Sequence, residues 1–344
     1  MKNSILEDRT AYRKNASNLP TNGFKSPAPL FSAILPDDNN LAEAKAFFRG
    51  KYLSVSSDVV KFDKPYDGRC VLCQDSSMVL VEPNFTVTGV FDGFGDSGEV
   101  LSRFFIDELF REFHAKRSIS FKEEDFKSSI NLAIEFSSLN AQGFIKKIEG
   151  GTTAIVALIL NDGTYFLACI GDSAIYKFSK TGLQRLSDNS MVGCMKNESG
   201  VLGYSVLPYT QIDLKQYLDN RHLVLEFLSS IGLSGSNPKI NFLSGHLEKS
   251  EKLILVTDGI TKNLSIIIGL LDLVKDASGV SDLQEIIKTK ASDRFIGRAV
   301  LKAVRERIAS SRETSLNDIL KSRTDGTVLV PQDDDRTVVV VKKF

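Results

Sequence analysis

The sequence lacks a net charge, a cysteine content typical of disulfide-rich proteins, and any long apolar run. Its 43 Lys and Arg residues equal its 43 Asp and Glu residues, so no overall field favours nucleic acid or an anionic membrane. Four cysteines in 344 residues do not indicate a disulfide framework and favour a reducing compartment, the cytoplasm or the nucleus. Any anionic ligand must therefore be held by a local site.

Targeting and membrane signals are also missing. Residues 1–15 have no apolar core of the kind that a signal peptide needs. The longest apolar stretch, residues 264–274, contains Asp272 and is much shorter than the roughly 20 residues of a transmembrane helix. We therefore expect neither a signal peptide nor a membrane span.

Two catalytic motifs and a zinc site are excluded in the same way. The sequence contains no GxSxG nucleophile elbow and no Walker lysine motif. Cys70 and Cys73 form a CxxC, but Cys169 and Cys194 do not supply a second one, so the ligands of a zinc site are incomplete. The cysteines are interpreted as strand residues.

A literal GxGxxG at residues 93–98 follows a predicted strand and precedes a helix, which raises the alternative of a dinucleotide-binding domain. Such a domain needs a second parallel strand that ends in an acid roughly 20 residues further on. Residues 99–148 instead have two helical patterns, and Asp92 would place negative charge beside the pyrophosphate. This alternative is disfavoured.

The remaining patterns predict an α+β fold. Apolar runs rich in β-branched and aromatic residues predict strands at 77–81, 85–91, 152–160, 165–170, 252–257 and 337–341. Helical periodicity covers 99–116, 124–148 and the region near 294–308, and a short helix is expected at 40–48. The turn Asn161-Asp162-Gly163 predicts an antiparallel hairpin.

The polar composition of the first 35 or so residues predicts an N-terminal arm, partly flexible, over residues 1–49. Residues 50–344 then form one domain. Strands that meander and helices that come in pairs favour sheets packed as a sandwich over a βαβ alternation.

Aspartates mark the ends of the predicted strands. Asp92, Asp172 and Asp258 follow strands, whereas Asp75 and the run 333–335 precede them. In an antiparallel sheet the end of one strand lies beside the start of its neighbour, so these acids can gather at one edge. A single Asp-Gly after a strand is most often a turn, but the recurrence of the pattern favours a metal site.

Carboxylates crowded at one edge repel one another, and a hard divalent cation such as Mg²⁺ or Mn²⁺ removes that cost. Two such ions about 3.5–4 Å apart can bind a phosphoryl group and activate a water.

Seven segments carry a family resemblance in sequence order. They are residues 74–75 (QD), 90–95 (VFDGFG), 151–154 (GTTA), 170–173 (IGDS), 187–192 (SDNSMV), 255–259 (LVTDG) and 334–337 (DDRT). Together they resemble the motifs of the metal-dependent protein phosphatases of type 2C, the PPM family, over residues 50–344.

The resemblance implies a four-layer α/β/β/α sandwich of two antiparallel sheets flanked by paired helices. It implies a protein serine/threonine phosphatase in which a water held by two Mg²⁺ or Mn²⁺ ions attacks the phosphoester. Asp92 would bridge the ions and Gly93 would offer its carbonyl oxygen. Asp258 and Asp334 would complete the coordination of the first ion, and Asp75 would orient the metal-bound water. The implied partner is a phosphorylated protein; the oligomeric state is open, with a monomer as the expectation.

The chain departs from the family pattern at auxiliary positions. Cys70 stands where the phosphate-binding arginine is usual, so Arg69 is the nearest candidate; Phe94 replaces a frequent histidine. Lys262 replaces an aspartate of a third metal site, which Asp172 would share, and its ammonium is a second candidate for holding the phosphate. These changes leave a catalytically weak or inactive pseudophosphatase, acting as a regulatory binding module, as the alternative.

Overall fold

The computed structural model describes fourteen parts of the chain. They are residues 30–34, 43–60, 74–94, 98–144, 151–171, 173–187, 190–197, 200–208, 223–224, 238, 240–264, 280–289, 295–312 and 335–344. Within these residues, no helix is both long and apolar enough to cross a membrane.

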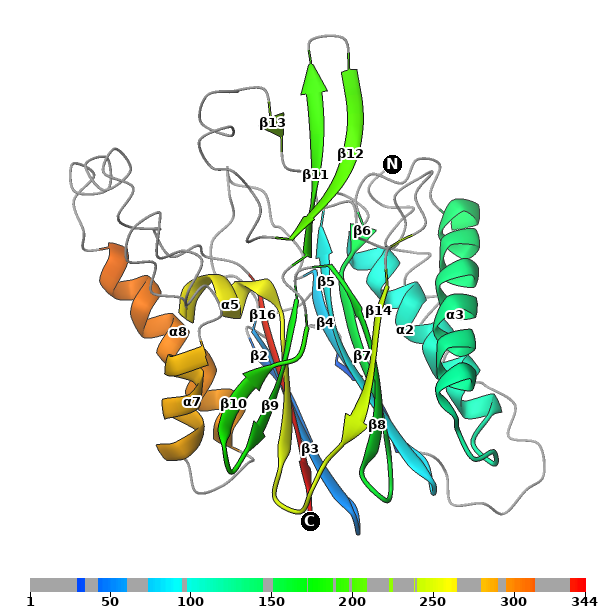
Figure 1. The fold of residues 1–344 in the computed structure, drawn as a ribbon, viewed down its shortest axis with the longest axis vertical. Helices are drawn as coiled ribbons and strands as arrows, with labels where there is room; N and C mark the ends of the chain where they lie inside the picture. Colours follow the sequence, from blue (N-terminus) through cyan, green and yellow to red (C-terminus); the bar gives the residue numbers. More distant parts are fainter. Residues whose placement is uncertain are drawn as a thin grey trace.

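Two antiparallel sheets lie face to face in the centre of the molecule (Figure 1). The first has the order β1-β4-β5-β7-β8-β14, with β6 paired to β5. Its strands are β1 (Leu30–Ile34), β4 (Asp75–Val81), β5 (Phe85–Phe94), β6 (Gly151–Thr152), β7 (Ala154–Leu160), β8 (Thr164–Ile170) and β14 (Asn241–His246).

The second sheet has the order β10-β9-β15-β16-β3-β2. Its strands are β2 (Glu43–Arg49), β3 (Leu53–Val60), β9 (Ala174–Ser179), β10 (Gly182–Arg185), β15 (Lys252–Val256) and β16 (Arg336–Lys343). A third, smaller sheet of β11 (Ser190–Asn197), β12 (Gly200–Pro208) and β13 (Leu223–Val224) projects beyond one end of the sandwich (Figure 1).

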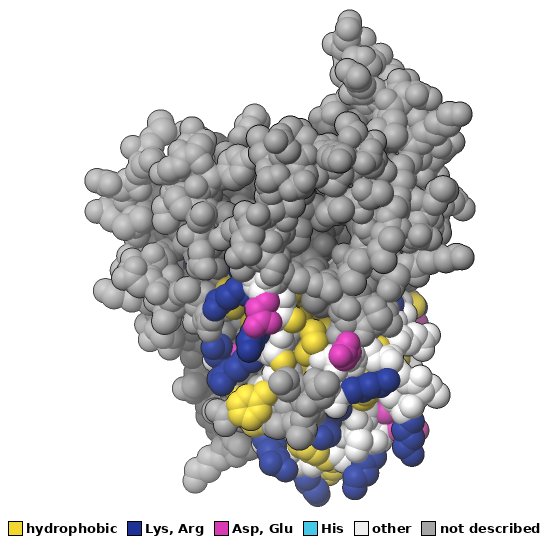
Figure 2. Space-filling view, turned by 90° about the vertical axis from the view of Figure 1, so that its left-hand side faces the viewer, with side chains coloured by type: hydrophobic (Ala, Val, Ile, Leu, Met, Phe, Trp, Pro, Cys, Tyr) yellow, Lys and Arg dark blue, Asp and Glu magenta, His cyan; other side chains and the backbone are white. Residues whose placement is uncertain are grey.

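Helices cover the outer face of each sheet. On the second sheet, α7 (Val280–Thr289) and α8 (Ile296–Arg312) bury Leu283, Ile296 and Val300 against strand residues such as Ile254 and Val338. Lys and Arg side chains outnumber Asp and Glu on the described part of this outer face (Figure 2). A charged outer face is expected of the outermost layer of a sandwich.

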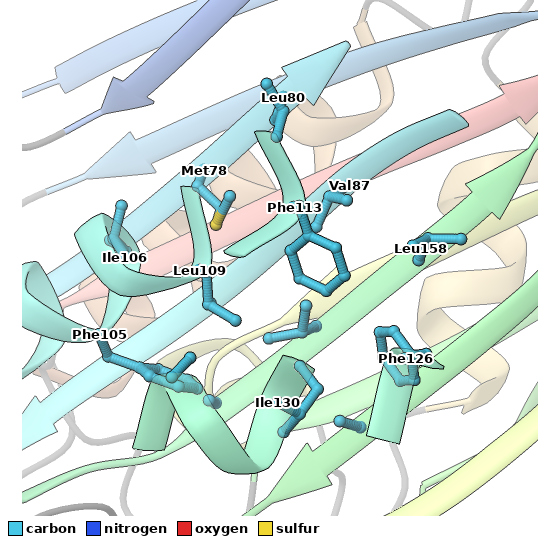
Figure 3. Packing of buried hydrophobic residues seen from close by; sticks show 14 of the residues in the cluster. Met78, Leu80, Val87, Phe105, Ile106, Leu109, Phe113, Phe126, Ile130 and Leu158 are labelled. Atoms are coloured by element: carbon cyan, nitrogen blue, oxygen red, sulfur yellow. The ribbon is translucent and has the colours of Figure 1, made fainter. Parts of the chain in front are cut away.

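On the first sheet, α2 (Gly98–Ala115) and α3 (Glu123–Phe144) form the opposite outer layer. Phe105 and Leu109 of α2, together with Ile130 of α3, pack against strand residues such as Met78 and Leu158 (Figure 3). Every one of these side chains is fully buried. The prediction of a four-layer sandwich of two antiparallel sheets flanked by helices is confirmed, and the parallel arrangement of a dinucleotide-binding domain is excluded for the described strands.

The layer between the two sheets changes from apolar to polar along the strands. Away from the predicted acids it holds Val55, Val79 and Val341. One step closer to them, the hydroxyls of Ser57 and Ser77 lie 2.7 Å apart and are buried. Buried polar groups need partners, so the sheets meet through hydrogen bonds at the end where β4 begins and through apolar contacts elsewhere.

Most predicted elements are confirmed, including the hairpin between β7 and β8. Gly163 in its turn has φ +104°, a conformation that favours glycine. The helix expected at residues 40–48 is wrong where the structure describes it, because β2 pairs with β3 there. Phe48 packs between the sheets whereas Phe47 is 41% exposed, which is the alternation of a strand at a sheet edge.

The N-terminal segment also contributes β1, which pairs with β4 at the other sheet. Two strands from residues 1–49 thus extend the two sheets. The division of the chain near residue 50 stays a prediction, and residues 1–29 lie outside the described part.

Burial raises the pKa of Asp107, on α2, from 3.8 to about 6; the nearby Arg111 opposes the rise and Glu108 adds to it. A carboxyl with a raised folded pKa stabilises the fold below its unfolded pKa, and this contribution is lost as pH rises through the folded value. We expect Asp107→Asn to be more stable than wild type by about 1–3 kcal/mol at pH 7.5, with the difference shrinking toward zero near pH 4. Urea unfolding across this range tests it, and a difference that is constant with pH would contradict it.

Candidate functional site

Asp75 and Asp92 lie side by side at one end of the first sheet. Asp75 begins β4, Asp92 is near the end of β5, and the two residues are direct partners in the antiparallel ladder. Asp75 is 1% exposed and Asp92 is partly exposed. The sequence argument that strand starts and strand ends would bring these acids together holds for this pair.

The second sheet brings further acids to the same end. Asp258 begins α5 (Asp258–Leu264), one residue beyond the end of β15, and is 7% exposed. Asp335 directly precedes β16, the ladder partner of β15. In the ladder between β15 and β16, Val256 is paired with Val338. Thr257, the residue before Asp258, therefore lies opposite Thr337, which follows Asp335 by two residues.

Hydrogen bonds from these threonines join the two sheets at Asp75. The hydroxyls of Thr257 and Thr337 donate to Oδ2 of Asp75 over 2.7 Å and 2.9 Å. All three residues are buried. Asp75 of the first sheet is therefore held in contact with the residue that precedes Asp258 in the second.

Asp335 makes a second link between the sheets. Its Oδ2 accepts the backbone N–H of Gln74 over 2.7 Å. The carboxylate of Asp335 therefore fixes the start of β4, where Asp75 begins. The predicted metal ligand of this segment was its neighbour, Asp334, which lies outside the described residues.

Gly93, on β5, lies close to the start of α2 and to the residue before β4. Its N–H donates to the carbonyl oxygen of Gln74 over 3.2 Å, and a Cβ on it would lie 2.6 Å from the carbonyl carbon of Gly98. No larger residue fits without movement of the backbone. The Gly of the Asp-Gly pair thus allows α2 to start beside Asp92.

Thr153 binds the backbone of Asp92 and is itself joined to Ser173. The N–H of Thr153 donates to the carbonyl oxygen of Asp92 over 2.8 Å. The hydroxyl of Thr153 lies 2.8 Å from that of Ser173, and both residues are buried. The segments with the sequences GTTA and GDS are therefore joined next to Asp92.

The donor chemistry of this end of the sandwich suits a hard cation, because the acids and the carbonyl of Gly93 offer only oxygen atoms. Among the residues that the structure describes, no three Asp, Glu, His or Cys side chains are grouped closely enough to hold one ion. Asp172 and Asp334 fall outside those residues. The metal site expected from the sequence therefore stays a prediction.

The two candidates for phosphate binding are not placed. Arg69 lies outside the described residues, as does Cys70. Lys262 belongs to α5, but its side chain lies outside the described part of the structure, and the same is true of the side chain of Phe94. Their roles stay predictions.

Sequence reasoning missed the threonines that hold Asp75. Thr257 was noted only as part of the segment LVTDG, and Thr337 only as the last residue of DDRT. A signal was present, because each threonine lies within two residues of an aspartate at a strand end. Their role depends on two sheets meeting, which pattern alone does not show.

The fold is that of the type 2C serine/threonine phosphatases, by comparison with solved structures. A serine/threonine phosphatase of S. agalactiae superposes with a TM-score of 0.54 at 14% identity, over 85% of this chain and 99% of that one. PppA, a regulatory component of T6SS in Pseudomonas aeruginosa, gives 0.51 at 15% identity, over 86% and 99%.

The PPM Ser-Thr phosphatase MsPP from Mycobacterium smegmatis, solved with cacodylate, gives a TM-score of 0.51 at 16% identity, over 85% of this chain and 99% of that one. No protein-family model matches the sequence, and no curated protein matches it. The likeness is thus one of fold, at a sequence identity that leaves activity to be argued from the site.

Gly259 is closely packed at the end of the sandwich that holds the acids. A Cβ at Gly259 would overlap the carbonyl oxygen of Asp335 and lie 3.3 Å from Cγ of Arg336. We expect Gly259→Ala to lower the free energy of unfolding by about 1–3 kcal/mol, because backbone must shift to make room. Urea denaturation measures this free energy.

Gly50→Ala is the matched control. The nearest neighbour of a Cβ at Gly50 would be the carbonyl oxygen of Leu53 at 3.5 Å, and we expect a change of at most about 0.5 kcal/mol. Equal effects of the two substitutions would contradict the close packing of Gly259.

Proposed function

We propose that this protein is a metal-dependent serine/threonine protein phosphatase that uses two Mg²⁺ or Mn²⁺ ions. The observation that carries the proposal is that Asp75, which is the ladder partner of Asp92, is hydrogen-bonded across the sandwich to the threonine that precedes Asp258. Acids from both sheets thus converge at one end. A phosphatase site with oxygen-only ligands needs such a convergence.

The proposed ligands are Asp92, Asp258 and Asp334, with the carbonyl oxygen of Gly93; Asp172 would belong to a third metal site. When bound, the cations supply charge for the phosphoryl oxygens and make a water more acidic. Asp75, fixed by two hydroxyl donors, orients that water by accepting a hydrogen bond from it. Arg69 and Lys262 are the proposed contacts to the phosphate.

A phosphorylated protein is the proposed substrate. Two of the compared structures are named as serine/threonine phosphatases, which supports this assignment as an analogy of fold. The exposed part of Asp92 suits a phosphorylated side chain that reaches the acids from solvent.

The second candidate function is that of a pseudophosphatase, a regulatory module with the same fold. The sequence observation in its favour is that Cys70 and Phe94 stand where the family usually has an arginine and a histidine. Against it, Asp75, Asp92 and Asp258 are all kept and lie at one end of the sandwich. We favour the enzyme.

Asp92→Asn separates these functions. We expect wild type to bind Mn²⁺ in calorimetry and to release phosphate from a phosphothreonine peptide. The variant should lose both by more than about 100-fold, because even residues that only support metal ligands contribute 10–100-fold. Asp162→Asn, at an exposed turn between β7 and β8, is the matched control and should behave as wild type.

Binding of Mn²⁺ by wild type without phosphate release would favour the pseudophosphatase. Unchanged Mn²⁺ binding by Asp92→Asn would show that the metal site is assigned to the wrong residues.

A further inference from the structure

Asp75 is a carboxylate that would be costly to bury on its own. It is 1% exposed, and burying a charged group is unfavourable unless hydrogen bonds compensate. Two hydroxyls from the opposite sheet donate to the same oxygen, Oδ2. The threonines therefore help to fix the direction of the carboxylate.

The direction of the Thr257 hydroxyl is set by a second hydrogen bond. Thr257 Oγ1 accepts the backbone N–H of Thr337 over 3.0 Å, so its own hydrogen is directed to Asp75. Thr337 Oγ1 donates to Asp75 over 2.9 Å, and both threonines are fully buried. Together they form a rigid pair of donors on adjacent strands.

Thr257 makes this contact in place of an ordinary local one. It stands directly before α5, and its carbonyl oxygen accepts the N–H of Ile260 over 3.1 Å, which makes it the N-cap residue. An N-cap threonine normally uses its hydroxyl oxygen to accept an N–H of the first helical turn. Here that oxygen accepts the N–H of Thr337 and donates to Asp75, so its hydrogen bonds serve the neighbouring strand and the carboxylate.

We propose that Thr257 and Thr337 are positioning residues for the reaction. They hold Asp75 from the opposite sheet in the one orientation in which its carboxylate can act beside Asp92. This inference rests on the proposed phosphatase function and deepens it by naming two residues that act through Asp75. A purely structural role, as a hydrogen-bonded link between the sheets, is the competing explanation.

A second hydrogen-bonded link between the sheets offers a control for the structural role. Ser57 and Ser77 also join the two sheets through a buried hydroxyl contact, at 2.7 Å. Ser77 lies two residues beyond Asp75 on β4, on the same face of the strand. Ser57→Ala thus removes an inter-sheet hydrogen bond without removing a donor to Asp75.

The decisive variant is Thr337→Val, which keeps the shape of the side chain and removes only the donor. Thr257→Val is less clean, because it also removes the acceptor of the Thr337 N–H. We expect Thr337→Val to lower Mn²⁺ affinity, measured by calorimetry, and kcat by about 10–100-fold. The KM for a phosphothreonine peptide should stay within about twofold, and Thr337→Ser, which restores the hydroxyl, should recover most of both losses.

Thermal unfolding in EDTA distinguishes the positioning role from the purely structural role without reference to activity. Thr337→Val and Ser57→Ala should both lower the melting temperature of the metal-free chain, whereas Ser57→Ala should keep the wild-type Mn²⁺ affinity and kcat. Equal loss of Mn²⁺ affinity in the two variants, or none in Thr337→Val, would overturn the positioning role.

The outcome for the proposed function is distinguishable. If wild type hydrolyses the peptide and Thr337→Val does so equally well, the proposed phosphatase function is supported and the positioning role is contradicted. If wild type binds Mn²⁺ without hydrolysis, catalysis falls and the Mn²⁺ affinities alone decide the role of the threonines. If wild type binds no Mn²⁺, both proposals are overturned.

Discussion

The packing of two antiparallel sheets across one shared layer is the constraint on which the site depends. An antiparallel ladder brings the start of one strand beside the end of the next, and face-to-face packing adds the ends of a second set of strands. Asp75 and Asp92 meet by the first rule, and Thr257 and Thr337 reach Asp75 by the second. At the polar end of the layer, Oδ2 of Asp75 accepts a hydrogen bond from each threonine. The apolar remainder of the layer supplies the driving force for packing.

Much of the fold could be predicted from the sequence because local chemistry and final structure agree. The run that becomes β5 is rich in β-branched and aromatic residues and ends in Asp-Gly, and the turn at Gly163 has the residues that a tight hairpin needs. The stripe of Phe105, Leu109 and Phe113 in α2 faces the core as its period indicates. These elements depend on spacing within one segment, which the sequence displays directly.

Other features depend on partners remote in sequence. Residues 43–49 have a helix-like composition, yet β3 provides a free ladder and Phe48 finds an apolar layer to fill, so tertiary context decides the outcome. Likewise, Asp335 could not be told apart from its neighbours in the run 333–335 by composition. Its bond to the N–H of Gln74 distinguishes it, and that bond joins residues that are 261 positions apart in the sequence.

The position of β16 has a consequence for how the molecule is assembled. This strand, the last of the described strands, lies in the interior of the second sheet, between β15 and β3. Neither neighbour can complete its ladder until β16 has been synthesised, so β3 (Leu53–Val60) must wait for a strand that begins at residue 336, and such long-range pairing is slow. Because Thr337 belongs to the same strand, and Asp335 directly precedes it, the step that closes the sheet also finishes the cluster around Asp75. A nascent chain that has not reached residue 336 therefore has neither a finished second sheet nor a fully held Asp75.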